Sequence, residues 1–235
     1  MTGPAELHDV PVLDAWDETS ALRGLRLALP PALARAYVRP GQIVKVGTGD
    51  GEAFYALASA PHPAGEAELL VKRGGRVADG LVVRALPGAT VACTAPFGQG
   101  FPVEEAEGRD VLLFAAGSGI APIRAVIQHV TRHRARFNRV TLFYGQRHQD
   151  EFAYVREHLD WDRAGIRVVL CPSGEDDLWQ GVRGRVQAVA RALGFGGARP
   201  GEAIAFLAGM TAMVDEVRAT LAEAGVPPDR VHANF

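Results

Sequence analysis

A glycine-rich turn after an apolar run is the part of this sequence whose residue types point most directly to chemistry. The apolar run Val111–Ala116 stops at Gly117-Ser118-Gly119-Ile120-Ala121-Pro122. Pro122 suits the first turn of a helix, because its missing N–H has no partner there in any case. Two glycines let a ligand approach the backbone, and the unpaired N–H groups and positive dipole end of a helix favour a phosphate. We therefore predict a turn between strand and helix that binds a phosphate or pyrophosphate, with an ordinary tight turn as the alternative.

The second half of the chain has the sequence pattern typical of a parallel sheet. From Asp110 onward, apolar runs alternate with segments in which apolar residues recur at helical spacing. Such alternation predicts a sheet covered by helices on both faces. We expect strands at Val111–Ala116, Val140–Tyr144, Ile166–Cys171 and Ala203–Ala208, and helices near Ile123–Arg134, Phe152–Leu159, Val186–Leu193 and Met213–Ala224.

The first half has a different pattern, which predicts a separate domain. Short runs of period-two character, broken by Pro and Gly, extend from Val10 to Pro96 and favour a small barrel or sandwich. The polar, turn-rich segment Gln99–Gly108 marks the expected border, which gives domains 1–103 and 104–235. The expected strands are Gly24–Leu29, Gln42–Val46, Phe54–Ala58, Glu68–Val71 and Thr90–Thr94, with helical spacing only over Val77–Leu86.

Composition narrows the function classes. The 235 residues carry a formal net charge of −2 and no Lys/Arg cluster, which argues against nucleic-acid or membrane-surface binding. There is no membrane-spanning apolar run and no leader segment, so we expect a cytoplasmic protein. Cys93 and Cys171 lie in apolar runs and are predicted to be buried; two cysteines cannot supply the four ligands of an iron–sulfur cluster. His129 and His133 share a helix face without an acidic partner, so no metal site is predicted.

Several separated motifs occur in the order typical of one family. The chain resembles the ferredoxin–NADP reductase superfamily over essentially its whole length. The motifs that carry the resemblance are Phe54-Tyr55-Ala56-Leu57-Ala58-Ser59, Gly74–Leu81, Pro96–Phe101, Gly117–Pro122, Tyr144-Gly145-Gln146-Arg147, Ser173 with Gly181 and Gly184, and Leu207–Val214 leading to Gly225-Val226-Pro227.

This resemblance implies an N-terminal antiparallel β-barrel that binds FAD and a C-terminal α/β domain with a parallel sheet that binds NAD(P)H. The residues implied for FAD are Phe54, Tyr55, Ala56, Leu57, Ala58, Ser59, Val71, Lys72, Arg73, Gly75, Val77, Ala78, Asp79 and Phe235. Those implied for NAD(P)H are Gly117, Ser118, Gly119, Ile120, Ala121, Pro122, Gly145, Arg147, Ser173, Gly209, Met210 and Met213. Tyr55, Ala208 and Phe235 are the residues expected nearest the reacting rings. Phe235 is expected either to cover the flavin ring or to close the domain interface.

Some positions depart from the family pattern. Ala53 stands where the family has an Arg that pairs with the FAD phosphate, so Arg73 or Arg76 becomes the candidate guanidinium. Ala56 replaces a Ser beside the flavin, and Ala208 replaces a Cys beside the nicotinamide. These losses bear more on hydride transfer than on cofactor binding.

The activity implied is that of a FAD-dependent NAD(P)H oxidoreductase. It would transfer hydride between nicotinamide and flavin, and single electrons to or from a protein acceptor. Two alternatives stay open: a reductase subunit of a larger redox complex, and a degenerate nucleotide-binding module with little catalysis, in keeping with Ala53, Ala56 and Ala208. The sequence leaves the choice between NADH and NADPH, the acceptor and the oligomeric state undetermined.

Overall fold

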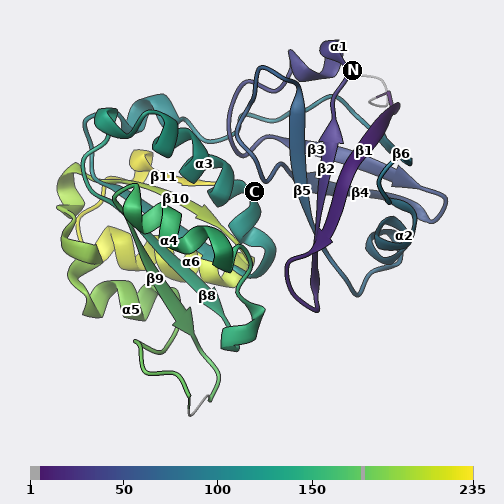
Figure 1. Cartoon of the computed structure of the whole chain (residues 1–235). Helices are drawn as coiled ribbons and strands as arrows, with labels where there is room; N and C mark the ends of the chain where they lie inside the picture. The colour runs from purple at the N-terminus through teal and green to yellow at the C-terminus, as the bar shows by residue number, and fades with distance from the viewer. Residues whose placement is uncertain (1–5, 176–177, 235) are drawn as a thin grey trace.

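Two sheets, each with its own core, lie side by side in the computed structural model, which describes residues 6–175 and 178–234 (Figure 1). The N-terminal half, purple and blue in Figure 1, contains one sheet, and the C-terminal half, green and yellow, contains the other. The predicted border segment Gln99–Gly108 falls on the connection between them, which contains the short 3₁₀ helix η1 (Val103–Ala106). The exact domain limits, 1–103 and 104–235, remain a prediction.

The N-terminal domain is a six-stranded antiparallel sheet. Its strands run in the order β4-β3-β6-β1-β2-β5, and the helices α1 (Pro31–Ala34) and α2 (Arg76–Arg84) lie in its connections. A bridge between Leu57 and Leu69 brings the end of β4 to β5 and joins the two edges of the sheet. The strands are β1 (His8–Asp17), β2 (Leu22–Ala28), β3 (Ile43–Thr48), β4 (Gly51–Ala56), β5 (Glu66–Lys72) and β6 (Thr90–Cys93).

The interior of this sheet is filled by alternate residues of its strands. Leu25 and Leu27 from β2 pack with Val44 and Val46 from β3, all four fully buried. Period-two burial of this kind is what the sequence predicted for these runs. The strand that sequence reasoning did not identify is β1, whose register shifts between Val12 and Asp14. That bulge breaks the alternation, so no uniform pattern marks the strand.

The C-terminal domain is a five-stranded parallel sheet in the order β11-β10-β7-β8-β9. The predicted parallel sheet with alternating helices is confirmed, with boundaries that differ by a few residues. Its strands are β7 (Val111–Ala116), β8 (Val140–Gln146), β9 (Ile166–Pro172), β10 (Ile204–Ala208) and β11 (Val231–Ala233). Its helices are α3 (Ile120–Arg132), α4 (Val155–Arg163), α5 (Val186–Ala192) and α6 (Thr211–Glu223). Short 3₁₀ helices occur at η2 (Gly117–Gly119), η3 (Arg134–Arg136), η4 (Gln149–Glu151), η5 (Gly194–Gly197), η6 (Pro200–Glu202) and η7 (Pro228–Arg230).

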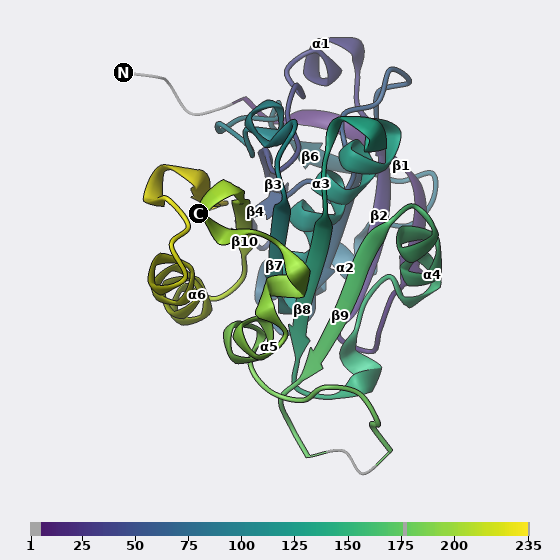
Figure 2. The ribbon, with the colours of Figure 1, turned by 90° about the vertical axis from the view of Figure 1, so that its left-hand side faces the viewer.

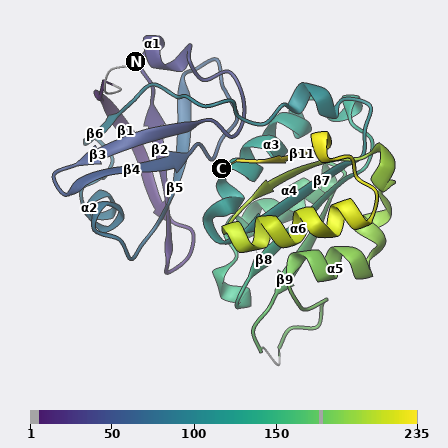
Figure 3. The ribbon, with the colours of Figure 1, turned by 180° about the vertical axis from the view of Figure 1, so that it is seen from behind.

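Helices cover both faces of the parallel sheet. In Figure 2, α5 and α6 lie on one side of the sheet, and α3 and α4 lie on the other. Figure 3 shows α5 and α6 lying across the face that is hidden in Figure 1. Because both faces are buried, β7 can be apolar at every position, and Leu112 and Leu113 contribute to opposite cores.

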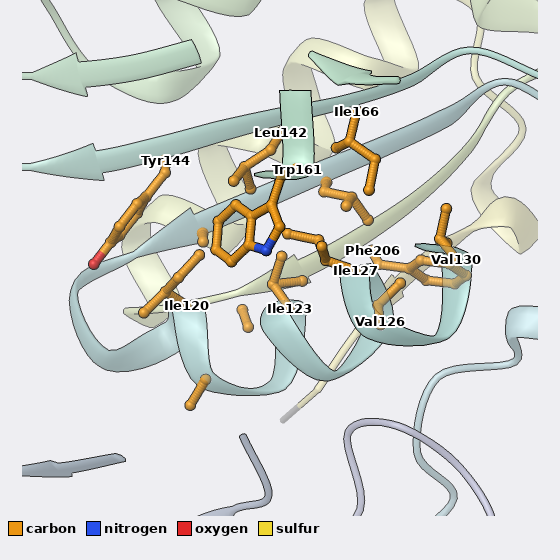
Figure 4. Packing of buried hydrophobic residues seen from close by; sticks show 14 of the residues in the cluster. Ile120, Ile123, Val126, Ile127, Val130, Leu142, Tyr144, Trp161, Ile166 and Phe206 are labelled. Carbon is orange, nitrogen blue, oxygen red and sulfur yellow. The ribbon is translucent and has the colours of Figure 1, made fainter. Parts of the chain in front are cut away.

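The core under α3 fixes the helix that follows the glycine turn. Ile123, Val126 and Ile127 point from α3 toward the sheet, where Leu142 and Trp161 meet them (Figure 4). All three α3 side chains are fully buried. Each buried aliphatic side chain contributes about 1.5–3 kcal/mol of transfer free energy, so this packing holds the N-terminus of α3 firmly at the end of β7.

None of the helices within the described ranges combines the length and apolar character needed to cross a bilayer. Cys93 and Cys171 are both buried and unpaired, as predicted.

Candidate functional site

A cavity of about 1010 Å³ opens between the two domains. The carboxyl ends of β7, β8, β9 and β10 form one wall, and β4 and β5 of the antiparallel sheet form the other. Ligands of open α/β sheets bind at the carboxyl ends of the strands, so the position of the cavity is the one that the fold favours. The predicted site residues in its wall are Phe54, Tyr55, Ala56, Lys72, Gly117, Ser118, Gly119, Ala121, Pro122, Gly145, Arg147, Ser173, Ala208, Gly209, Met210 and Met213.

The glycine turn after β7 presents backbone to the cavity. Gly117 has a φ of +58°, and no heavy atom lies within 4 Å of the position that a Cβ would take there. The carbonyl oxygen of Gly117 accepts a hydrogen bond of 3.4 Å from the Tyr144 hydroxyl, which ties the turn to β8. Burial raises the pKa of Tyr144 to about 12, so this hydroxyl keeps its proton at neutral pH. The turn therefore leaves open space where a phosphate needs close approach to N–H groups.

The end of β10 packs directly against this turn. A Cβ on Gly119 would lie 2.3 Å from the carbonyl oxygen of Ala208, so only glycine fits. Gly209 has a φ of +157°, and a Cβ there would meet the Met213 methyl at 2.5 Å. Ala208 is buried, whereas Met210 is 72% exposed. Two glycine backbones thus bring β7 and β10 together at the cavity.

The ends of β8 and β9 form the far part of the wall. A Cβ on Gly145 would lie 2.8 Å from a methyl group of Val186 at the start of α5. The backbone N–H of Arg147 donates to the Glu151 carboxylate at 3.0 Å, and the Arg147 side chain is exposed. The Ser173 hydroxyl donates to the carbonyl oxygen of Gln146 at 3.2 Å. Arg147 and Ser173 therefore both line this part of the wall.

On the antiparallel side, two aromatic residues of β4 border the cavity. Phe54 is 61% exposed and contacts Phe97 edge-on, with ring centroids 6.1 Å apart. Tyr55 is half-buried, and burial together with the Asp79 carboxylate raises the pKa of its hydroxyl. An exposed ring such as that of Phe54 can cover a flat apolar ligand.

Other predicted residues lie outside the cavity wall. Leu57, Ala58, Ser59, Val71 and Ile120 are buried within the two domains. The predicted pyrophosphate segment Gly75, Val77, Ala78 and Asp79 forms the start of α2, where the Asp79 carboxylate accepts the N–H of Gly74 at 2.9 Å.

The arginine candidates for the missing phosphate partner differ in their surroundings. Arg73 donates to the Asp17 carboxylate at 2.6 Å and to the carbonyl oxygen of Ser20 at 3.1 Å. Arg76 is exposed at the first position of α2. Because Arg73 is already paired, Arg76 is the better placed of the two. Phe235 lies outside the described residues, and the preceding Asn234 lies beside Gly41 of the antiparallel domain.

Several polar residues of the wall were not predicted as site residues. Glu216 of α6 accepts hydrogen bonds from the Arg185 guanidinium at 2.9 Å and from the Gln187 amide. Glu216 is 29 or more positions away from Arg185 and Gln187 in the sequence, so no local motif could have revealed the cluster. Gln146 could have been found, because it lies inside the Tyr144–Arg147 motif. The other unpredicted residues of the wall include Leu70, Glu151 and Cys171.

The second domain matches a known family of nucleotide-binding domains. Residues 113–219 match the model of the oxidoreductase NAD-binding domain. Over the full chain, the fold superimposes on the ferredoxin reductase of carbazole 1,9a-dioxygenase with a TM-score of 0.81 and 27% identity, covering 100% of this chain and 70% of that one. The chain is similar to members of the ferredoxin–NADP reductase superfamily in both of its domains. Its two domains, an antiparallel β-barrel followed by an α/β domain, are those expected of that superfamily.

A curated relative and a further structure extend the similarity to the superfamily. Sulfhydrogenase 1 subunit gamma of Pyrococcus furiosus is 34% identical over 190 residues, which cover 78% of this chain and 65% of that subunit. The chain therefore spans slightly less than two thirds of this relative's length. A ferredoxin NADP+ reductase from Neisseria gonorrhoeae, solved with bound FAD and NADP, has a TM-score of 0.79 over 99% of this chain and 100% of that one. At 18% identity, that likeness bears on the fold alone.

Proposed function

We propose that this protein is a FAD-dependent NAD(P)H reductase that exchanges single electrons with a protein partner. The observation that carries the proposal is the shared cavity, in which the Gly117–Gly119 turn of one domain faces Tyr55 and Lys72 of the other. Such an arrangement allows two ring systems, one held by each domain, to meet.

The nicotinamide nucleotide would bind along the carboxyl ends of the parallel strands. The open space at Gly117 and the N–H groups at the start of α3 fit its pyrophosphate. Arg147 and Ser173 would contact the adenosine half, since they lie along the same wall. Gly209 and Ala208 would border the nicotinamide end.

FAD would bind on the side of the antiparallel domain. Gly74 and Gly75 fit its pyrophosphate, because no heavy atom lies within 4 Å of a Cβ position on either glycine. Tyr55 and Phe54 would cover the ring system, and Arg76 or Lys72 would supply a positive charge that Ala53 cannot. When bound, FAD accepts two electrons from NAD(P)H and releases them one at a time.

In this reaction the protein's own residues would mainly orient the two ring systems. The cavity wall has small residues at Ala56 and Ala208, which admit rings closely but offer neither a hydroxyl nor a thiol. Correct placement alone can supply about 7–11 kcal/mol of the barrier reduction. The proposal therefore requires a well-fixed geometry between the two domains more than any acid or base.

A second reading, in which the chain is the reductase subunit of a larger redox complex, is favoured by one observation. The 34% identical relative is itself named as a subunit, the gamma subunit of a sulfhydrogenase. Both readings share the same cofactors and differ in whether the electron partner is stably bound. We place either activity in the cytoplasm.

The test is spectroscopic. The purified protein, reconstituted with FAD, is titrated without oxygen with NADH and then with NADPH, and flavin absorbance is recorded. Loss of the flavin absorbance on addition of either coenzyme supports the proposal, and the ratio of the two apparent affinities decides the preferred coenzyme. A protein that binds a nicotinamide nucleotide but no FAD would contradict it and favour the degenerate module. Co-purification of a redox-active protein would favour the subunit of a larger complex over a reductase that meets its partner transiently.

A further inference from the structure

A buried arginine crosses the interface between the two domains. Arg124 lies on α3, two residues after Pro122, and its side chain is only 7% exposed. Its guanidinium donates to the carbonyl oxygen of Ala58 at 2.8 Å and to the Glu68 carboxylate at 2.6 Å, both in the antiparallel domain. Within its own domain it donates to the Glu157 carboxylate at 2.7 Å. One side chain thus holds groups from three elements of two domains.

The two ends of this contact lead directly to the cavity. Ala58 follows β4, whose residues Tyr55 and Ala56 line the cavity on the antiparallel side. Glu68 lies on β5, two residues before Leu70 in the same wall. Arg124 is one helical turn from Ala121, which lies in the opposite wall. Movement of the guanidinium relative to Ala58 would therefore change the distance between the two walls.

A second cross-domain contact converges on the same place. The Glu18 carboxylate, at the tip of the β1–β2 hairpin, accepts the backbone N–H of Tyr154 at 2.9 Å. The Tyr154 ring lies under Arg124, with its centroid 4.5 Å from the guanidinium carbon. Tyr154 has a φ of +59°, which is unfavourable for a residue with a side chain and persists only where the surroundings enforce it. The two contacts together fix Tyr154 between the domains.

The chemistry of the contact requires arginine. A guanidinium offers five N–H donors in a rigid plane, so it can serve Ala58, Glu68 and Glu157 at once. A lysine ammonium is a single point charge on a flexible stem and cannot reach three groups in one plane. A cation this deeply buried also depends on its partners, because an unpaired buried charge is strongly unfavourable.

We propose that Arg124 is a positioning residue, which fixes the separation between the flavin-side segment Tyr55–Ala58 and the nicotinamide-side turn Gly117–Pro122. Its catalytic consequence rests on the proposed function, whereas its structural consequence does not. Arg124 contacts neither coenzyme in this assignment; it acts through Ala58, Glu68 and the first turns of α3.

A distance measurement tests the structural part. Spin labels are placed through Val83→Cys on α2 and Ala222→Cys on α6, both exposed positions in different domains; the two native cysteines are buried. Pulsed electron paramagnetic resonance then reports the distance between domains. One narrow distribution is expected in the parent, and a broader or shifted one in Arg124→Lys and Glu68→Gln. Unchanged distributions in both folded variants would overturn the inference.

Kinetics test the catalytic part in the FAD-loaded protein. The rate of flavin reduction at saturating coenzyme should fall about 100-fold in Arg124→Gln, the loss typical of a misplacement near 1 Å, while the coenzyme dissociation constant changes less than threefold. The rates of flavin reduction in Arg124→Lys and Glu68→Gln should lie between those of Arg124→Gln and the parent. These two variants keep the test valid if Arg124→Gln does not fold.

The matched control is Arg132→Gln. Arg132 donates to the carbonyl oxygen of Pro61 at 2.8 Å, a cross-domain contact two turns farther along α3. This variant should keep the parent's distance distribution and reduction rate. A loss in Arg132→Gln equal to that in Arg124→Gln would overturn the specific role of Arg124. A parent that is not reduced by either coenzyme would refute the proposed function, while the distance measurement would still decide the role of Arg124 at the interface.

Discussion

The backbone of Gly119 lies against the carbonyl oxygen of Ala208, with no space for a side chain between them. A Cβ on Gly119 would stand 2.3 Å from that oxygen and 2.7 Å from the backbone nitrogen of Gly209. The turn after β7 and the end of β10 are therefore in direct backbone contact at the cavity. The contact is possible because Gly119 carries a hydrogen atom where any other residue would carry a Cβ.

We expect Gly119→Ala to separate these two segments. Relief of the overlap requires a backbone shift, which should lower the free energy of unfolding by about 1–3 kcal/mol. Binding of the nicotinamide nucleotide should weaken at least tenfold, because the N–H groups of the turn move with the backbone. Urea denaturation and calorimetric titration with NAD+ and NADP+ measure the two effects.

The control for this variant is Gly201→Ala. No heavy atom lies within 4 Å of a Cβ position on Gly201, and its φ is not in the left-handed region. It should match the parent in both stability and nucleotide affinity. Parent-like nucleotide binding in Gly119→Ala would show that the turn does not hold the coenzyme.

Gly75→Val tests the flavin side. A Cβ on Gly75 meets nothing within 4 Å, and its φ of −137° suits a β-branched residue, so the protein without flavin should still fold. Because Gly75 is the N-cap of α2, the apolar replacement should lower the free energy of unfolding by only about 1 kcal/mol. If the FAD pyrophosphate binds at the start of α2, the added isopropyl group would obstruct it. We expect FAD affinity to fall at least tenfold, or about 1.4 kcal/mol, measured by quenching of flavin fluorescence. Unchanged affinity would place the pyrophosphate elsewhere.

Ala56→Ser restores the hydroxyl that the family pattern has beside the flavin. Ala56 is half-buried in the cavity wall, so one added oxygen can be accommodated. A neutral hydrogen bond that forms with the reacting ring is worth about 1 kcal/mol, which corresponds to an acceleration of flavin reduction of about fivefold. Stopped-flow absorbance at saturating coenzyme measures this rate. A rate at or below that of the parent would indicate that the hydroxyl is not needed here.

The two buried cysteines predict an alkaline loss of stability. Burial raises the pKa of Cys93 and of Cys171 from 9.0 to about 12. The folded state holds these protons more tightly than the unfolded state. The contribution of each thiol to the free energy of unfolding is therefore constant below pH 9 and falls as the pH rises from 9 toward 12. The slope is about 1.4 kcal/mol per pH unit for each thiol.

The double variant Cys93→Ala, Cys171→Ala should lose stability less steeply than the parent between pH 9 and pH 11. Urea denaturation at several pH values provides the measurement. Below pH 9 the native thiols should also resist iodoacetamide and react after unfolding. Equal alkaline slopes in the parent and the double variant would contradict the raised pKa values.

Local sequence determined most of the secondary structure. Apolar runs and helical spacing predicted β7 at its observed bounds, Val111–Ala116, and the α/β alternation that follows it. These features follow from which side chains must leave water, which adjacent residues alone decide. The β1 strand was not found, because its bulge between Val12 and Asp14 interrupts the period.

The glycine motifs were also legible in the sequence, and the structure places Gly117, Gly145 and Gly209 around one cavity. The polar contacts in that cavity and at the domain interface could not be predicted from the sequence. Arg124 and Glu68 are 56 residues apart, Arg185 and Glu216 are 31 apart, and Glu18 and Tyr154 are 136 apart. Spacing along a chain predicts only neighbours on the same helix or strand. Which distant charges meet is decided by how the two domains pack against each other, so only the tertiary structure could reveal the role of Arg124.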